Sequence, residues 1–174
     1  MTSSTFSRVI EVIPTLIETL SYPDNTVVDD TCLCWARLID SCKTNKEQLE
    51  RIITLDLLRK LVGLMPVPGN ANAVRPPAFT HLLRIFRAIS KHSPHLSYQL
   101  LDLDIATSFY QILTGSATMP QNQESPNTLA LGKWKDSMPS IMSTLVDLLP
   151  PLPTGMVFEC FITQILSNEY RGLA

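Results

Sequence analysis

The chain has 174 residues, which is enough for one domain with a substantial apolar core. Hydrophobic residues make up 45% of it and charged residues 17%, a balance that excludes a disordered chain and suits a well-buried helical protein. The formal net charge of -2 gives no overall basic field, so we expect neither nucleic acid nor an anionic membrane as a partner. No apolar run reaches the roughly 18–20 residues that span a bilayer.

The N-terminus has no basic segment followed by an apolar core, so it does not look like a secretory signal. We therefore expect a protein of the nucleus and/or the cytoplasm, in which cysteines stay reduced. The four cysteines are Cys32, Cys34, Cys42 and Cys160.

In the first half of the chain, apolar side chains recur at helical spacing. This spacing predicts helices over residues 6–22, 24–42, 46–54, 55–65 and 76–91, with a loop at 66–72. Pro14 is expected at a helix start or at a kink. Asp24 or Asn25 is a candidate cap for the second helix, and Thr44 or Asn45 for the third.

The helix predicted at 24–42 is apolar over an unusually large part of its circumference. One face carries residues spaced by 4, 3, 4 and 3, namely Val28, Cys32, Trp35, Ile39 and Cys42. Leu33 and Leu38 form a second apolar line beside it. Such a helix must be packed between neighbours, as an inner helix of a stacked array.

In the second half, short helices are predicted at 95–103 and 105–114. The polar segment 115–128 is expected to be a flexible loop. Residues 129–149 carry a helical pattern interrupted near Pro139, and a break at 150–155 precedes a last helix at 156–170.

A short helix followed by a long apolar helix recurs along the chain. The pattern occurs at 13–20 with 24–42, again at 57–64 with 76–91, and a third time at 105–113 with 129–149. Ile13 and Leu57 lie 44 positions apart, and Arg37 and Arg87 lie 50 apart. Periods of about 40–47 residues are typical of armadillo and HEAT arrays. We therefore predict one all-α domain over 1–174, an armadillo/HEAT-like superhelical array of about three repeats at 6–43, 44–93 and 94–155.

The sequence offers no convincing metal or catalytic site. Cys32 and Cys34 lie two apart on a helix and point about 200° away from each other, so they cannot chelate together, and we expect both to be buried and inert. His92 and His95, with His81 one helix earlier, have no ligand at suitable spacing and are interpreted as loop or helix-end residues. No nucleophile motif, phosphate loop or carboxylate pair is present. We expect no cofactor, no metal, no catalytic residue and no small-molecule substrate, which disfavours a small helical enzyme.

One basic strip has two interpretations. Arg84, Arg87 and Lys91 are spaced by 3 and 4 on the helix predicted at 76–91, and Arg37 matches Arg87 in the preceding repeat. The strip could be a solvated face opposite the core. It could also line a partner-binding groove, since the last helix of each armadillo repeat lines the concave face, and a basic strip there would suit an acidic peptide or protein surface. Trp35 is interpreted as core, although a groove-facing Trp would be a binding hot spot.

At the run TCLCWARLID, residues 31–40, the chain resembles the armadillo region of the HECT E3 ubiquitin ligases of the ubiquitin-fusion-degradation type, which include the thyroid-receptor-interacting ligase of animals. Further similar stretches lie at 12–16, 56–58, 84–86, 99–101, 112–115 and 147–153. The resemblance covers roughly residues 10–158, whereas 156–174 fits the family poorly.

The resemblance implies that this region recruits a protein substrate, or a ubiquitylated protein, for ubiquitin-dependent degradation. In the family, a separate HECT domain carries the thioester cysteine. This chain has no such domain, so we expect no catalytic activity from it alone, and expect it to be a fragment or a short product of a ligase gene.

The alternative is a general armadillo/HEAT adaptor or transport factor unrelated to ubiquitin. Import adaptors of the armadillo class use repeated Trp and Asn side chains on successive third helices. Here the position matched to Trp35 is Ile85, which weighs against import binding.

Overall fold

The computed structural model describes residues 3–115 and 134–148 of the chain. Its elements in order are α1 (Ser3–Glu18), a 3-10 turn η1 (Thr19–Ser21), α2 (Asn25–Cys42), α3 (Lys46–Ile52), α4 (Leu55–Gly63), α5 (Pro76–His92), α6 (Pro94–Asp102), α7 (Ile105–Thr114) and α9 (Met138–Leu148). All regular structure in these two ranges is helical, so the all-α prediction is confirmed there. The loop expected at 115–128, apart from Gly115, and the last helix expected at 156–170 lie outside the described residues.

The helices predicted at 24–42, 46–54, 55–65, 76–91, 95–103 and 105–114 have ends within two residues of the observed ones. The helix predicted at 6–22 ends earlier, at Glu18, and within the described residues α9 begins only at Met138. Helix α1 begins at Ser3 and continues through Pro14, so the interpretation of Pro14 as a helix start is wrong. Pro139, in contrast, lies in the first turn of α9, where the missing backbone N–H costs no helical hydrogen bond.

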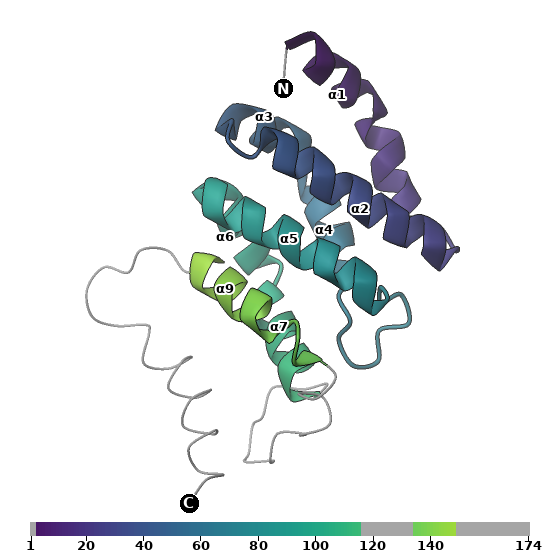
Figure 1. The fold of residues 1–174 in the computed structure, drawn as a ribbon, viewed down its shortest axis with the longest axis vertical. Helices are drawn as coiled ribbons and strands as arrows, with labels where there is room; N and C mark the ends of the chain where they lie inside the picture. Colours follow the sequence, from purple (N-terminus) through teal and green to yellow (C-terminus); the bar gives the residue numbers. More distant parts are fainter. Residues whose placement is uncertain (1–2, 116–133, 149–174) are drawn as a thin grey trace, which may run out of the picture.

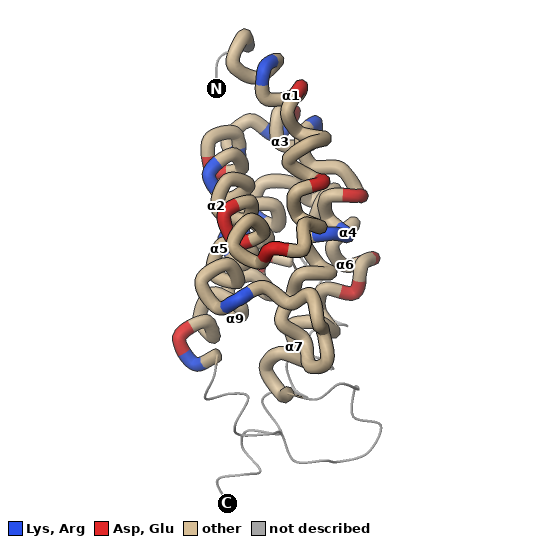
Figure 2. The backbone as a smooth tube through the Cα atoms, turned by 90° about the vertical axis from the view of Figure 1, so that its right-hand side faces the viewer, with Lys and Arg blue, Asp and Glu red and all other residues tan. Residues whose placement is uncertain are grey.

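The helices are arranged in two layers (Figures 1 and 2). Helices α2, α5 and α9 run side by side in the same direction, and α4, α6 and α7 lie along the other side. The most extensive helix–helix contacts are those of α5 with α2 and with α9. This stacking of long helices, each preceded by shorter ones, is compatible with the predicted helical repeat array.

Side-chain caps explain where several helices begin. The Asp24 carboxylate accepts a hydrogen bond from the Thr26 backbone N–H at 2.8 Å, and Asn45 accepts one from Gln48 at 3.1 Å. Both caps were among the predicted candidates. Each one satisfies a helix N–H group that has no partner within the helix.

The apolar stripe predicted on α2 forms the centre of the core. Its five residues are all buried, and Trp35 is completely inaccessible. The Trp35 indole N–H donates to the Leu16 carbonyl at 3.3 Å, which satisfies its one polar group inside the core. Trp35 is therefore confirmed as a core residue and does not line a groove.

Ser93, in the turn between α5 and α6, links this turn to α3. Its hydroxyl is fully buried between α5 and α6, accepts from the Leu96 backbone N–H at 3.3 Å and donates to the Glu50 carboxylate at 2.6 Å. One side chain thus caps α6 and bonds to α3, so the turn between α5 and α6 is fixed against α3.

Candidate partner-binding face

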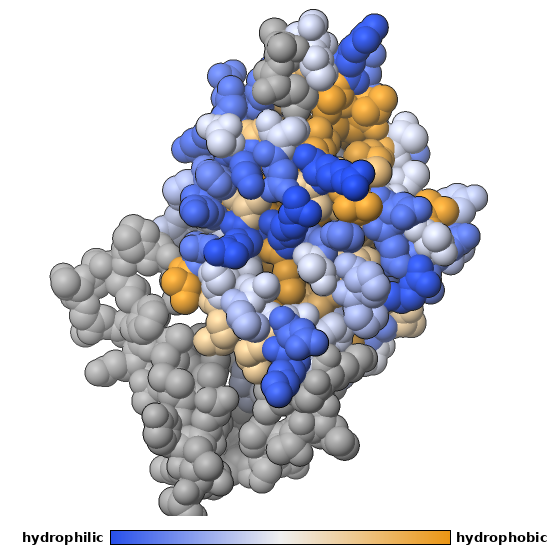
Figure 3. Space-filling view, in the orientation of Figure 1, coloured by the Kyte–Doolittle hydropathy of each residue, from blue (hydrophilic) through white to orange (hydrophobic). Residues whose placement is uncertain are grey.

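The four basic residues predicted to line a groove are all exposed on the layer of long helices. Arg37 lies on α2, and Arg84, Arg87 and Lys91 lie on α5. Figure 3 views this layer and shows hydrophilic side chains gathered over α2 and α5. We call this surface the α2–α5–α9 face.

Two of the four cations are held by carboxylates on neighbouring helices. Arg84 forms an ion pair with Asp40 of α2, whereas the Arg87 Nε lies 3.8 Å from Asp147 Oδ2 of α9. The two arginines therefore turn toward opposite neighbours, although their spacing of 3 places them near one another on α5. A third cross-helix pair joins Arg75, just before α5, to Asp29 of α2.

The other two predicted cations have no such carboxylate. Within residues 3–115 and 134–148, neither Arg37 nor Lys91 forms an ion pair. The predicted basic strip is thus a mixture of paired and unpaired cations.

The charges on this face shift the pKa values of two of its residues, Asp40 and His81. Burial raises the pKa of Asp40, but hydrogen bonds and charges from Lys43 and Arg84 outweigh it, so the pKa lies below its ordinary value. Desolvation lowers the pKa of His81, and the nearby Arg84 and Arg37 lower it further against the opposing charge of Asp29. Because the charges of both guanidinium groups lower the pKa of one imidazole, Arg37 of α2 and Arg84 of α5 lie on the same part of this face.

The histidines and cysteines fall into separate environments. His92 ends α5 and His95 lies in the first turn of α6, as predicted for helix-end residues. Cys32 is buried, and burial raises the pKa of its thiol to about 12. Cys34 is exposed, so the prediction that both cysteines are buried is wrong for Cys34. The reason is the 200° separation itself: when one residue of the pair faces the core, the other must face away.

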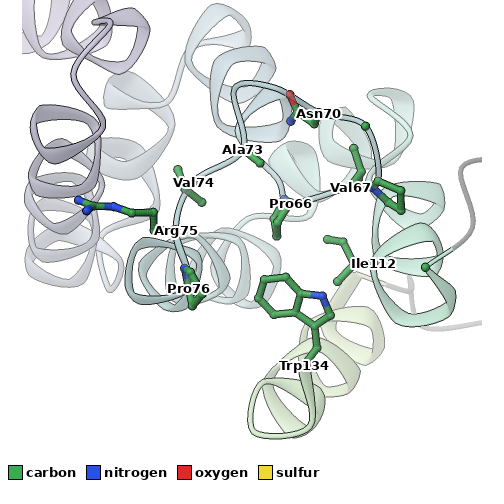
Figure 4. A pocket seen from close by; sticks show the side chains of 12 residues that line it. Pro66, Val67, Asn70, Ala73, Val74, Arg75, Pro76, Ile112 and Trp134 are labelled. Carbon is green, nitrogen blue, oxygen red and sulfur yellow. The ribbon is translucent and has the colours of Figure 1, made fainter. Parts of the chain in front are cut away.

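The described residues hold no group of three or more His, Cys, Asp or Glu side chains that could bind a metal ion. Among them there is also no helix both long and apolar enough to cross a bilayer. A cavity of about 490 Å³ lies between the α4–α5 loop, the end of α7 and Trp134 (Figure 4). We assign no ligand to it because its walls at Gly115 and Trp134 border residues 116–133, which are not described.

Sequence reasoning missed the acidic half of this face. Asp29, Asp40 and Asp147 each form an ion pair with an arginine of α5 or of its N-terminal flank, 44 to 60 residues away in the sequence. Asp40 does lie three residues after Arg37 on one helix, so a search for complementary charges on consecutive long helices could have identified it. The actual pairing depends on how the helices stack.

The fold and this face define the class: an all-helical layered array that presents a charged surface on its parallel long helices. No family model matches the chain. In sequence it is similar to the E3 ubiquitin-protein ligase UPL3 of Arabidopsis thaliana, at 27% identity over 86% of this chain, and to the E3 ubiquitin-protein ligase TRIP12 of Danio rerio, at 26% over 91%. A further similar protein is the E3 ubiquitin-protein ligase UPL4 of Arabidopsis thaliana, at 18% over 88%.

The predicted resemblance is therefore confirmed: the chain matches one region of the HECT E3 ubiquitin ligases of this family. The chain spans only 8% of the length of UPL3 and of TRIP12. The similarity is thus to one region of each of these ligases.

Proposed function

We propose that this chain is the substrate-recognition, armadillo-like segment of a HECT-type E3 ubiquitin-protein ligase that acts in ubiquitin-dependent protein degradation. In this role it binds a protein substrate, or ubiquitin carried by that substrate, in the nucleus and/or the cytoplasm. The HECT domain of such a ligase supplies the catalytic cysteine. The observation that carries the proposal is the match of nearly the whole chain to ligases of a plant and a fish.

The structure supports protein binding by the α2–α5–α9 face. Parallel long helices in one layer give an extended surface of the kind that helical repeat proteins use for binding. Arg37, Arg84, Arg87 and Lys91 are exposed there and are the proposed contact residues. The buried position of Trp35 disfavours the alternative of an import-type adaptor, because that mode of binding needs a Trp side chain in the groove.

Binding is tested with the purified chain immobilised on a resin. We expect it to retain a reporter protein fused to ubiquitin more strongly than the same reporter without ubiquitin, if ubiquitin on the substrate is what it recognises. A nuclear-localisation peptide serves as the competing ligand. Retention of that peptide, with no retention of the ubiquitin fusion, would favour the general adaptor.

Catalysis is tested separately. The chain is incubated with ubiquitin, ATP and the activating and conjugating enzymes, and the products are separated without reductant. We expect no thiol-sensitive ubiquitin adduct on the chain. A thioester formed on the chain alone would refute a non-catalytic recognition segment.

A further inference from the structure

The cross-helix ion pairs of the α2–α5–α9 face are asymmetric in their exposure. The carboxylates are the sheltered partners: the side chains of Asp29, Asp40 and Asp147 are 16%, 23% and 29% exposed. The guanidinium groups are the outer partners: Arg75, Arg84 and Arg87 are 53%, 53% and 54% exposed. A molecule that approaches this face therefore meets arginine before it meets aspartate, even though the charges are paired.

The arginines also keep unused donors. A guanidinium group has five N–H donors in a planar fork. Arg84 forms its ion pair with Asp40 through one terminal nitrogen. The 3.8 Å between Arg87 Nε and Asp147 Oδ2 is too long for a hydrogen bond. The guanidinium groups of Arg84 and Arg87 can thus donate hydrogen bonds to a further carboxylate while they keep their existing ion pairs.

Unpaired cations extend the same surface. Arg37 shares the field on His81 with Arg84, and Lys91 lies two turns after Arg84 on α5. The one exposed carboxylate on the adjoining part of α2 is Asp30, which lies two turns before Arg37, toward the start of the helix. The positive region is therefore concentrated over the C-terminal halves of α2 and α5.

We propose that this region binds an acidic segment, a stretch rich in Asp or Glu, of the protein that the chain recognises. The inference rests on the proposed recognition function and specifies the chemistry of its partner. Arg37, Arg84, Arg87 and Lys91 supply the cations, and the more sheltered carboxylates of Asp40 and Asp147 offset part of the charge of two of them. Carboxylates suit the guanidinium fork through paired N–H donors, and the net charge of -2 disfavours a polyanion as long and dense as nucleic acid.

The test uses fluorescence anisotropy of the full chain with a labelled Glu/Gly peptide, and with the same peptide carrying Gln in place of Glu. We expect the Glu peptide to bind more tightly, and its affinity to fall as salt is raised, because exposed charges are screened. The double substitution Arg84→Glu with Arg87→Glu should weaken binding by about tenfold or more, equivalent to ~1.4 kcal/mol. The pair Arg84→Gln and Arg87→Gln, with circular dichroism of each variant, separates loss of binding from loss of folding.

Three further variants test the direction of the charge effect and its location on the surface. Asp40→Asn removes a competing negative charge from the face and should tighten binding, opposite to the arginine substitutions. Arg59→Glu and Asp56→Asn change the same charges at exposed positions on α4, outside this face, and should leave the affinity unchanged. Equal binding of the Gln peptide, equal effects of the α4 controls, or tighter binding of a single-stranded oligonucleotide would each refute the inference.

Failure of this inference is distinguishable from failure of the proposed function. If the unsubstituted chain retains the ubiquitin-fused reporter but the Arg84→Glu, Arg87→Glu variant binds the Glu peptide as tightly as the unsubstituted chain does, the acidic-segment inference is lost and recognition stands. If the unsubstituted chain retains neither the reporter nor the Glu peptide, the proposed recognition function fails as well.

Discussion

Trp35 shows how one side chain can join two neighbouring helical elements. Trp35 lies on α2 and its ring is completely buried in the core. Its indole N–H donates a hydrogen bond to the carbonyl of Leu16 near the end of α1. The side chain thus combines a large apolar contact area with a directed hydrogen bond. Both contributions are lost together when the ring is removed.

We expect Trp35→Ala to lower the free energy of unfolding by about 3–5 kcal/mol, because it removes buried apolar area and leaves a cavity. Urea denaturation followed by circular dichroism measures this loss. The matched control is Val12→Ala, since Val12 is 56% exposed on α1 and its truncation should change stability by no more than about 0.5 kcal/mol. Similar losses for the two variants would contradict a core role for Trp35.

The cysteines of α2 give a second prediction for single residues. Burial raises the pKa of Cys32 to about 12 and that of Cys42 to about 11, so both thiols stay protonated and are shielded from reagents. We expect iodoacetamide to modify Cys34 in the folded chain much faster than Cys32 or Cys42, as measured by mass spectrometry of the peptides. In denaturant the three rates should converge, and equal rates in the folded chain would refute the assignment.

At the scale of helices, α5 is held from both sides by charge as well as by apolar packing. It contacts α2 through Arg84 and Asp40, and contacts α9 through Arg87 and Asp147. Exposed pairs of this kind contribute only about 0.2–1 kcal/mol each, so the apolar contacts of α5 supply most of the stability. The pairs instead fix which side chains of α5 point to each neighbour.

The pair of Asp40 and Arg84 should show itself in the pH dependence of stability. Because the pKa of Asp40 is lowered in the folded chain, its contribution is present above the ordinary carboxyl value of 3.8 and is lost as pH falls through the lowered value. We expect Asp40→Asn to be less stable than the unsubstituted chain at neutral pH, and this difference to shrink under acid. The measurement is urea unfolding across that range, with Asp56→Asn on α4 as the control. A difference that persists unchanged below the lowered pKa would contradict the ion-pair contribution.

For the whole molecule, the layered arrangement places one imidazole among charges from two helices. His81 of α5 lies near Arg37 and Asp29 of α2 as well as Arg84 of its own helix. A single sequence segment does not contain this environment, since it arises only when α2 and α5 stack. The stability of the array is therefore coupled to the protonation of this side chain.

Because desolvation and the two arginines lower the pKa of His81 in the folded chain, the unfolded chain binds more protons below the ordinary value of 6.5. Stability should therefore decrease as pH falls from 6.5 toward the lowered pKa and level off below it. We expect His81→Gln to flatten this part of the profile of unfolding free energy against pH. An unchanged slope in that variant would show that other groups cause the dependence.

The sequence alone predicted the helices and most of their ends, because these depend on local spacing and on caps such as Asp24 and Asn45. It also predicted the core stripe of α2 and the exposure of the basic residues, since both follow from the helical period. It was wrong at Pro14, where α1 continues through the proline, and at Cys34, which lies on the exposed side of α2. The partners of Arg84 and Arg87 were decided by the tertiary structure alone, because they lie 44 and 60 residues away on helices whose stacking depends on long-range packing.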